Sequence, residues 1–174
     1  MLRAARRDHG PAIIHLSDTW RQRLSPTAIV AAYVPVGAEA DPAPLVRAAI
    51  DAGCGIALPH VVDRAGPLRF LRWATDTALV DGPFGLRQPQ EDADEVEPTI
   101  ILTPLVGFDR RGARLGQGAG HYDRAFAACP NARRVGVALA VQEVDSLPVD
   151  AWDIPLHAIA TDKEWITVTD RTDS

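Results

Sequence analysis

The stretch Gly107-Phe108-Asp109-Arg110-Arg111-Gly112-Ala113-Arg114-Leu115-Gly116-Gln117-Gly118-Ala119-Gly120-His121-Tyr122-Asp123-Arg124 is the most informative part of the chain. It holds five of the 13 glycines, together with four arginines. We expect Gly116, Gly118 and Gly120 to take positive φ and to bring backbone N–H groups close to a ligand, while the arginines supply charge. The stretch therefore predicts an anion-binding loop, and the expected ligand is a polyphosphate.

The segments on either side place this loop between a strand and a helix. Residues 99–106 form an apolar, β-branched run typical of a buried strand, and residues 121–128 have the composition of a helix. The N-terminus of that helix would face a bound phosphate. The loop has neither a G-K-[ST] ending nor the spacing G-x-G-x-x-G. A glycine-rich surface turn without a ligand is the alternative, and the arginine density and Asp123 weigh against it.

The remaining sequence alternates between helix and strand patterns. Helices are predicted over 2–9, 12–24, 44–52 and 121–128, with Gly10-Pro11 between the first two. Strands are predicted over 29–36, 55–62, 69–73, 77–80, 99–106, 134–140, 156–160 and 165–168, and 88–97 is predicted to be a loop. We therefore predict a single α/β domain over 1–174, with three layers (α/β/α), a mostly parallel sheet and ligands at the carboxyl ends of the strands.

Composition restricts the class of protein. A chain of 174 residues that is 47% hydrophobic can bury a full core. Its apolar runs are shorter than the roughly 18 to 20 residues of a membrane span, and no signal peptide is apparent, so we expect a cytoplasmic protein. The net charge of -5 argues against nucleic acid as a partner. Cys54 and Cys129 lie in or beside apolar segments, which favours buried free thiols over a disulfide.

The run F-D-x-x-G-x-R-L-G-x-G-x-G-x-Y-D-R, from Phe108 to Arg124, resembles the signature of the 5-formyltetrahydrofolate cyclo-ligase family, also called 5,10-methenyltetrahydrofolate synthetases. Members of this family use ATP and Mg²⁺ to close 5-formyltetrahydrofolate to 5,10-methenyltetrahydrofolate. The resemblance implies this reaction, through an iminium phosphate intermediate, with small molecules as partners and neither nucleic acid nor membrane. Weaker similarity covers Leu2-Arg3, Glu39, Leu58-Pro59, Phe84 to Pro89, Asp153 and Ile159-Ala160-Thr161.

The resemblance also implies the site residues, and it implies catalytic roles for Glu39 and Arg114. The folate site would hold Glu39, Phe84, His121 and Tyr122. Magnesium would be held by Asp123 and Asp153, although Asp123 could instead favour the helix dipole and Asp153 could be an ordinary turn residue. The ATP site would comprise Arg3, Arg7, Arg114, Leu115, Gly116, Gln117, Gly118, Ala119, Gly120, Tyr122 and Asp123.

The chain departs from the family pattern at its start, where members carry K-x-x-L-R. Leu2 and Arg3 match, but the lysine would fall before Met1, so we expect weaker ATP binding that depends on Arg3, Arg6 and Arg7. Ala119, His121 and His157 are further departures. The alternative function is a non-catalytic nucleotide- or folate-binding relative on the same fold. An enzyme acting on phosphosugars or CoA esters is a second alternative, disfavoured because Lys163 is the only lysine.

Overall fold

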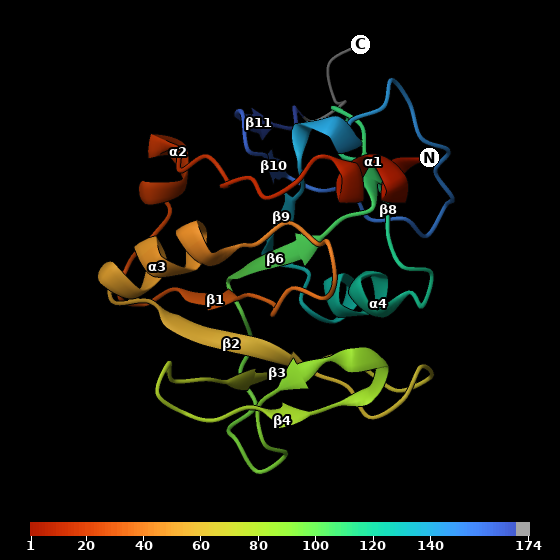
Figure 1. The fold of residues 1–174 in the computed structure, drawn as a ribbon. Helices are drawn as coiled ribbons and strands as arrows, with labels where there is room; N and C mark the ends of the chain where they lie inside the picture. Colours follow the sequence, from red (N-terminus) through yellow and green to blue (C-terminus); the bar gives the residue numbers. More distant parts are fainter. Residues whose placement is uncertain (170–174) are drawn as a thin grey trace.

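The computed structural model describes residues 1–169, and their main feature is a seven-stranded sheet with the order β11-β10-β9-β6-β1-β2-β3 (Figure 1). The inner strands run parallel to one another, and each edge strand is antiparallel to its neighbour. The prediction of a mostly parallel sheet is confirmed. The inner strands are β10 (Ala158–Ala160), β9 (Arg133–Val137), β6 (Ile100–Pro104), β1 (Ile29–Ala31) and β2 (Gly55–His60); the edge strands are β11 (Trp165–Thr167) and β3 (Arg69–Arg72).

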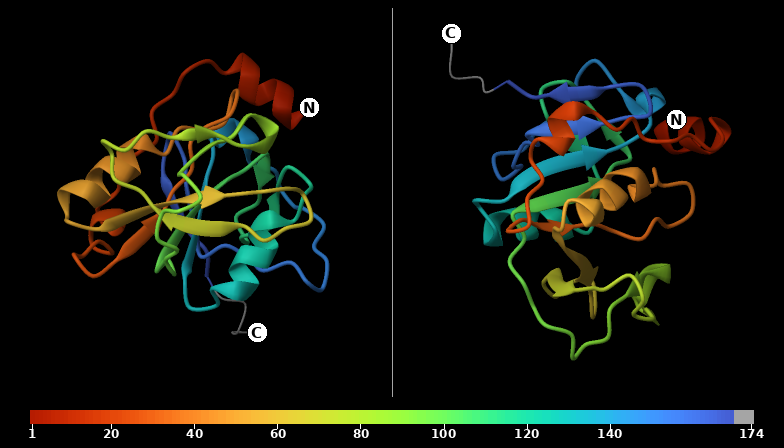
Figure 2. Two further views of the ribbon diagram at one scale, coloured as in Figure 1. Left: turned by 90° about the horizontal axis from the view of Figure 1, so that it is seen from below. Right: turned by 90° about the vertical axis from the view of Figure 1, so that its left-hand side faces the viewer.

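Helices cover both faces of the sheet, so the three-layer prediction is also confirmed. On one face α2 (Asp18–Arg21) and α3 (Ala43–Asp51) pack on a core that includes Val30 and Leu102. On the other face α4 (His121–Ala128) packs on a core that includes Ala31 and Ile101 (Figure 2). Neighbouring residues of one strand enter different cores because side chains alternate across a sheet. Both faces are buried, which is why these strands read as continuous apolar runs.

Helix α1 (Leu2–Asp8) lies at the end of the sheet rather than on a face, against the short 3₁₀ helix η2 (Ala140–Gln142). Gly107 makes this packing possible, because a Cβ atom there would lie 2.5 Å from Cδ1 of Leu2. The buried Arg6 donates from Nη1 to the Leu105 carbonyl at 3.3 Å. These contacts hold α1, and therefore its arginines, beside the carboxyl end of β6.

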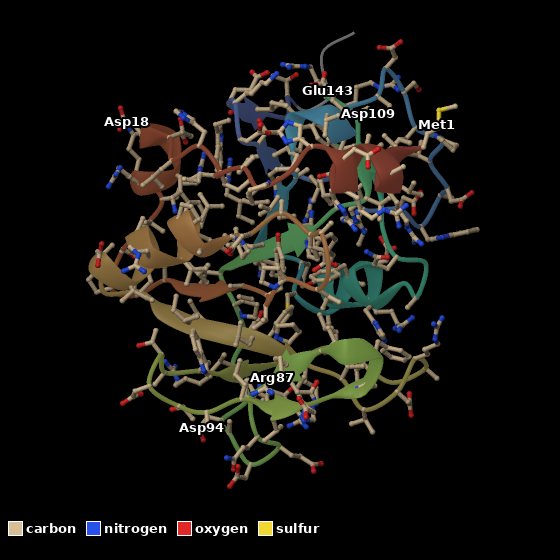
Figure 3. All side chains as sticks on the ribbon, in the orientation of Figure 1. Met1, Asp18, Arg87, Asp94, Asp109 and Glu143 are labelled. Atoms are coloured by element: carbon tan, nitrogen blue, oxygen red, sulfur yellow. The ribbon has the colours of Figure 1, made fainter. Side chains whose placement is uncertain are left out.

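Two short hairpins complete the fold. In the first, β4 (Val80–Asp81) pairs with β5 (Arg87–Gln88) around the 3₁₀ turn η1 (Pro83–Gly85); in the second, β7 (Gly107–Phe108) pairs with β8 (Arg114–Leu115). Asp109 closes the second hairpin: its carboxylate is fully buried and accepts N–H groups of Arg111, Ala113 and Leu147 at 2.9 to 3.2 Å. Burial alone would raise the pKa of Asp109, but these hydrogen bonds leave the pKa lowered. Asp109 lies near Glu143 (Figure 3), because the backbone of Glu143 forms an isolated β-bridge with Phe108, the residue before Asp109.

The helix predicted over 12–24 is wrong except for α2. Residues 12–16 are extended, with the His15 N–H bonded to the Thr161 carbonyl at 2.8 Å. Ile13 is 81% exposed while Ile14 is buried, which is an alternation typical of an extended chain. Ser17 caps α2 by accepting the Trp20 N–H at 3.1 Å. The helix therefore starts six residues later than its apolar spacing suggested, and it ends at Arg21.

Other boundaries differ by a few residues. The strand predicted over 29–36 pairs regularly only as far as Ala31, and the one predicted over 77–80 is reduced to the start of β4, because Thr77 closes a turn with Ala74. The loop predicted over 88–97 contains one isolated bridge, between Glu95 and Leu71.

Both cysteines are free and buried, as expected. In the part of the chain that the structure describes, no helix is long and apolar enough to cross a membrane, and the cellular compartment stays a prediction.

Candidate functional site

A cleft of about 1030 Å³ opens at the carboxyl ends of the parallel strands. Tyr33 and Val34 line it just after β1, Pro59 lines it in β2, and Thr103 and Pro104 line it at the end of β6. The chain leads from β1 to one side of the sheet and from β6 to the other, although these two strands are neighbours. Such a switch point leaves a crevice between the diverging loops, which is where open α/β sheets bind ligands.

All the side chains and loop residues predicted to form the site line this one cleft. Two stretches from the N-terminal half, α1 and the segment after β1, meet the loop between β8 and α4 and the segments around Phe84 and Asp153. The members are Arg3, Arg7, Glu39, Phe84, Arg114, Leu115, Gly116, Gln117, Gly118, Ala119, Gly120, His121, Tyr122, Asp123 and Asp153.

The loop 116–120 has the backbone needed to approach a ligand closely. Gly118 and Gly120 take positive φ, at 96° and 69°, whereas Gly116 does not, contrary to our expectation. A Cβ atom at Gly116 or Gly118 would meet nothing within 4 Å, so the backbone at these two glycines is open. Helix α4 begins at His121, directly after Gly120, as the sequence predicted. A ligand in the cleft would face the first N–H groups of this helix.

Gln117 joins two segments of the cleft that are distant in the sequence. Its Oε1 atom accepts from Nη2 of Arg3 on α1 at 3.1 Å, and its Nε2 atom donates to Oε1 of Glu39 at 3.4 Å. The other carboxylate oxygen of Glu39 accepts the Val36 N–H at 2.9 Å. The glycine loop is thus hydrogen-bonded to α1 on one side and to the segment after β1 on the other.

Burial perturbs the titratable groups around Glu39. It raises the pKa of Glu39, against the opposing effects of the Val36 N–H, the Arg6 charge and Gln117. It also raises the pKa of Tyr122, with the Glu39 charge as a second cause, and that of Tyr33, whose hydroxyl donates to the Ala40 carbonyl at 2.5 Å. Both phenols therefore remain protonated at neutral pH. A raised carboxyl pKa inside a cleft is typical of functional sites.

Arg114 and Asp123 form the most enclosed ion pair of the cleft. Arg114 donates from Nη2 to Oδ1 of Asp123 and from Nη1 to the Ile154 carbonyl at 2.5 Å, and its guanidinium lies 4.6 Å from the centroid of the Phe126 ring. The Arg114 side chain is only 9% exposed. The residue is thus held rigidly between β8, α4 and the segment before β10, with its charge at the cleft wall.

The carboxylates of Asp123 and Asp153 both reach the cleft, and Oδ2 of Asp153 accepts the Asp150 N–H at 2.7 Å. Within the described residues no group of three or more His, Cys, Asp or Glu side chains could hold a metal ion. Two carboxylates on one cleft fit Mg²⁺ only if phosphate oxygens and water complete its shell, which is the usual arrangement for this ion.

Comparison with known proteins agrees with this geometry. The profile of the 5-formyltetrahydrofolate cyclo-ligase family matches residues 9–162. The chain belongs to this family.

Individual relatives cover most of the chain. The 5-formyltetrahydrofolate cyclo-ligase of Escherichia coli (strain K12) is 37% identical over 144 residues, which cover 78% of this chain and 79% of the relative. That of Mycolicibacterium smegmatis is 36% identical over 146 residues, covering 79% and 75%. The NMR structure of Aquifex aeolicus 5,10-methenyltetrahydrofolate synthetase matches with a TM-score of 0.69 and 27% identity, over 99% of this chain and 84% of that one.

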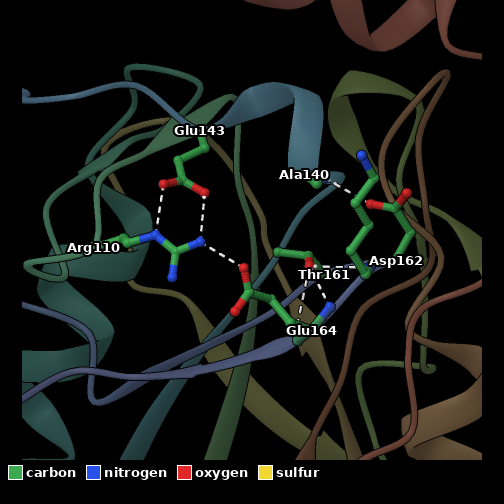
Figure 4. A network of polar contacts seen from close by, with 7 residues as sticks. Arg110, Ala140, Glu143, Thr161, Asp162 and Glu164 are labelled. Carbon is green, nitrogen blue, oxygen red and sulfur yellow. Dashed lines mark hydrogen bonds and ion pairs between the residues drawn. The ribbon is translucent and has the colours of Figure 1, made fainter.

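Of the four arginines in the signature stretch of this cyclo-ligase family member, only Arg114 lines the cleft. Arg110 instead pairs with Glu143 at 2.7 Å and with Glu164 at 2.5 Å (Figure 4). Arg111 pairs with Asp109, and Arg124 donates to the carbonyls of Ala119, Arg64 and Gly66. The expectation that all four supply charge to a ligand is therefore wrong, because three of them stabilise the loops around the cleft.

Some cleft residues did not stand out in the sequence. Arg64 lies over the Phe84 ring, with Cζ 5.0 Å from the ring centroid. Among the described residues, Phe84 is the only non-glycine residue with positive φ, at 61°, a conformation that costs about 1 to 3 kcal/mol. Thr103 is buried, and its Oγ1 atom, at the end of β6, has no hydrogen-bond partner. The family resemblance implied Phe84 as a folate-site residue, but nothing local in the sequence indicated that Arg64 would lie against its ring.

Proposed function

We propose that this protein closes 5-formyltetrahydrofolate to 5,10-methenyltetrahydrofolate with ATP and Mg²⁺, releasing ADP and phosphate. One observation carries the proposal: the part of the family signature from Arg114 to Asp123, together with Glu39, Phe84 and Asp153, lines a single cleft at the switch point of the sheet. The cleft volume of about 1030 Å³ lies at the upper end of the roughly 300 to 1,000 Å³ of small-molecule sites, which agrees with a site for two substrates. Relatives that cover most of the chain are named for this reaction.

The chemistry requires that the formyl oxygen be activated. An amide oxygen is a poor leaving group, so nitrogen 10 cannot displace it directly. If the formyl oxygen attacks the γ-phosphoryl group, ADP leaves and an iminium phosphate forms at nitrogen 5. Nitrogen 10 then attacks the activated carbon, and phosphate departs with the former formyl oxygen. No covalent enzyme nucleophile is needed, and the main demands are alignment and stabilisation of the phosphoryl charge.

The two ends of the cleft suit the two substrates. In the right-hand view of Figure 2, α1 and η1 stand at the same edge of the molecule, one above the other. At the α1 end, Arg3, Arg7 and the open backbone of loop 116–120 would bind the ATP phosphates. At the η1 end, Phe84 would pack against the flat rings of the folate. Glu39, which Gln117 connects to the loop, would orient the formyl region toward the phosphate.

Tyr122 and His121 line the cleft at the start of α4, and we expect the two substrates to meet beside them. Because Tyr122 stays protonated, its hydroxyl is available as a hydrogen-bond donor. Asp123 and Asp153 would hold Mg²⁺ together with phosphate oxygens; the ion, when bound, neutralises the charge of the transferred phosphoryl group. Arg114 keeps Asp123 in place and adds a positive charge at the cleft wall.

The test is turnover of 5-formyltetrahydrofolate, followed as the absorbance of the methenyl product with ATP and Mg²⁺ present. Turnover that requires all three components supports the proposal. Calorimetric binding of ATP or of 5-formyltetrahydrofolate without turnover would instead identify a non-catalytic binding protein. As a matched pair, Arg3→Ala should raise the KM for ATP about 10-fold or more, since charge-assisted phosphate contacts contribute about 1.5 to 3 kcal/mol. Arg110→Ala, which removes an arginine outside the cleft, should leave this KM within twofold.

A further inference from the structure

The η1 end of the cleft carries a positive charge that no acidic side chain neutralises. The Arg64 guanidinium lies 5.0 Å from the centroid of the Phe84 ring, and within residues 1–169 it has no carboxylate partner. Arg87, on the same rim, pairs with Asp81 at 2.9 Å and donates to the Leu79 carbonyl at 2.8 Å. Arg87 lies in the lower part of the molecule in Figure 3, away from Met1 and α1. The Arg64 guanidinium, unlike that of Arg87, is therefore available to a ligand.

The backbone of Arg64 is held in place although its side chain is exposed. Arg124 of α4 donates to the Arg64 carbonyl at 3.1 Å, and Nε2 of His121 lies 3.3 Å from the Asp63 carbonyl oxygen. The Asp63 carboxylate accepts the N–H groups of Ala65 and Gly66 at 2.9 and 2.6 Å. The loop that carries Arg64 is thus tied to the helix that follows the glycine loop. An anchored loop presents the guanidinium at a defined place on the rim.

Phe84 is held in a backbone conformation that is unfavourable for its residue type. Its positive φ is unfavourable for an aromatic residue, yet Phe84 is 51% exposed and lines the cleft. Strain of this kind is concentrated at ligand sites. An exposed aromatic residue with an unneutralised guanidinium over one face of its ring suits a ligand with a flat apolar part next to a carboxylate.

We propose that Arg64 recognises the glutamate carboxylates of the folate substrate and so sets the preference for glutamate-bearing folates. The inference rests on the proposed function. If the formyl group lies near Glu39 and the ATP phosphates, the glutamate is the part of the substrate farthest from the reaction and lies toward the rim. A guanidinium fork pairs well with a carboxylate and can keep its contact with an aromatic face while doing so.

The experiment compares two substrates, 5-formyltetrahydrofolate and the primary amide of 5-formyltetrahydropteroate, which lacks the glutamate and carries no other carboxylate. For each we would measure kcat and KM for the parent chain, Arg64→Gln and the matched control Arg87→Gln, and the dissociation constant by calorimetry. Arg64→Gln should raise the KM and dissociation constant of the glutamate substrate about 3- to 10-fold, the range for a partly exposed charged contact. Both constants for the pteroate amide, and kcat for either substrate, should stay within twofold. Arg87→Gln should change neither substrate by more than twofold.

Salt provides an independent readout, because screening weakens an exposed ion pair. The preference of the parent chain for the glutamate substrate should shrink as salt is raised, and that of Arg64→Gln should not. Equal losses on both substrates, or no loss on either, would overturn the inference. If the parent chain turns over neither substrate, the proposed reaction fails, and calorimetry alone then decides the role of Arg64: a parent that does not bind the glutamate ligand more tightly than the pteroate amide refutes it.

Discussion

Gln117 donates to Glu39 across 78 positions of the sequence, with 3.4 Å between Nε2 and Oε1. The same side chain accepts from Arg3 at 3.1 Å. One amide in the glycine loop therefore contacts a residue from each of the two regions that we assign to the two substrates. Replacing it should affect both ends of the cleft.

Gln117→Ala should raise the KM for both ATP and 5-formyltetrahydrofolate about 2- to 10-fold, because it removes two hydrogen bonds that contribute about 0.5 to 1.5 kcal/mol each. The loss should not add to that of Arg3→Ala, since the two side chains form one contact. Steady-state kinetics of both single variants and the double variant measure this coupling. Fully additive losses would show that the hydrogen bond does not persist when ATP is bound.

Glu39→Gln should impair folate binding and leave ATP binding intact, because it removes a charge at the folate end and none at the phosphates. Calorimetry with each ligand separates the two effects. The matched control is Glu143→Gln, which changes a carboxylate that pairs with Arg110 outside the cleft. Loss of ATP binding with unchanged folate binding would contradict the assignment.

The same substitution has a pH signature in the free energy of unfolding. Burial raises the pKa of Glu39 in the folded state above its ordinary value of 4.5. At any pH between 4.5 and the raised pKa, the folded state therefore binds more protons than the unfolded state. The contribution of Glu39 to stability is therefore fully present below the ordinary pKa and is lost as pH rises through the raised one. Glu39→Gln should gain stability relative to the parent between pH 4 and pH 7 in urea unfolding. A difference that is constant with pH would mean that the pKa is not raised.

Asp123→Asn and Asp153→Asn should both raise the Mg²⁺ concentration needed for activity, but they should differ in stability. Asp123 is paired with Arg114, whose side chain is 9% exposed, so loss of the carboxylate should cost about 1 to 2 kcal/mol. The Asp153 side chain accepts only an exposed backbone N–H of the neighbouring turn, and its loss should cost less than about 0.5 kcal/mol. Activity of both variants within twofold of the parent at limiting Mg²⁺ would remove the metal assignment.

Gly116→Ala should leave stability within about 0.5 kcal/mol but weaken ATP binding. The added Cβ meets nothing within 4 Å and φ at this position is not positive, so any loss reports a ligand that approaches the backbone. Gly120→Ala is the contrasting variant, because its φ of 69° should cost about 1 kcal/mol or more even without ligand. Unchanged ATP affinity in Gly116→Ala would place the phosphates elsewhere.

Local patterns were sufficient where one physical cause dominates. The apolar runs of β6 and β2 predicted buried parallel strands because both of their faces are covered, and Gly120 before His121 marked the start of α4. The apolar spacing over 12–24 misled, because Ile13 and Ile14 alternate as an extended chain beside Thr161, a partner that local sequence does not reveal.

The sequence by itself determined the family, the α/β class and the part of the cleft from Arg114 to Asp123, because a signature of closely spaced glycines, arginine and aspartate lies within one continuous stretch. Tertiary structure decided which of the four arginines in that stretch lines the cleft. Arg110 and Arg111 form ion pairs with Glu143, Glu164 and Asp109 outside the cleft, whereas the ion pair of Arg114 with Asp123 lies on the cleft wall. Only the folded chain brings Arg64 onto Phe84 and connects Arg3 to Glu39 through Gln117, because these contacts join segments that meet only when the sheet has formed.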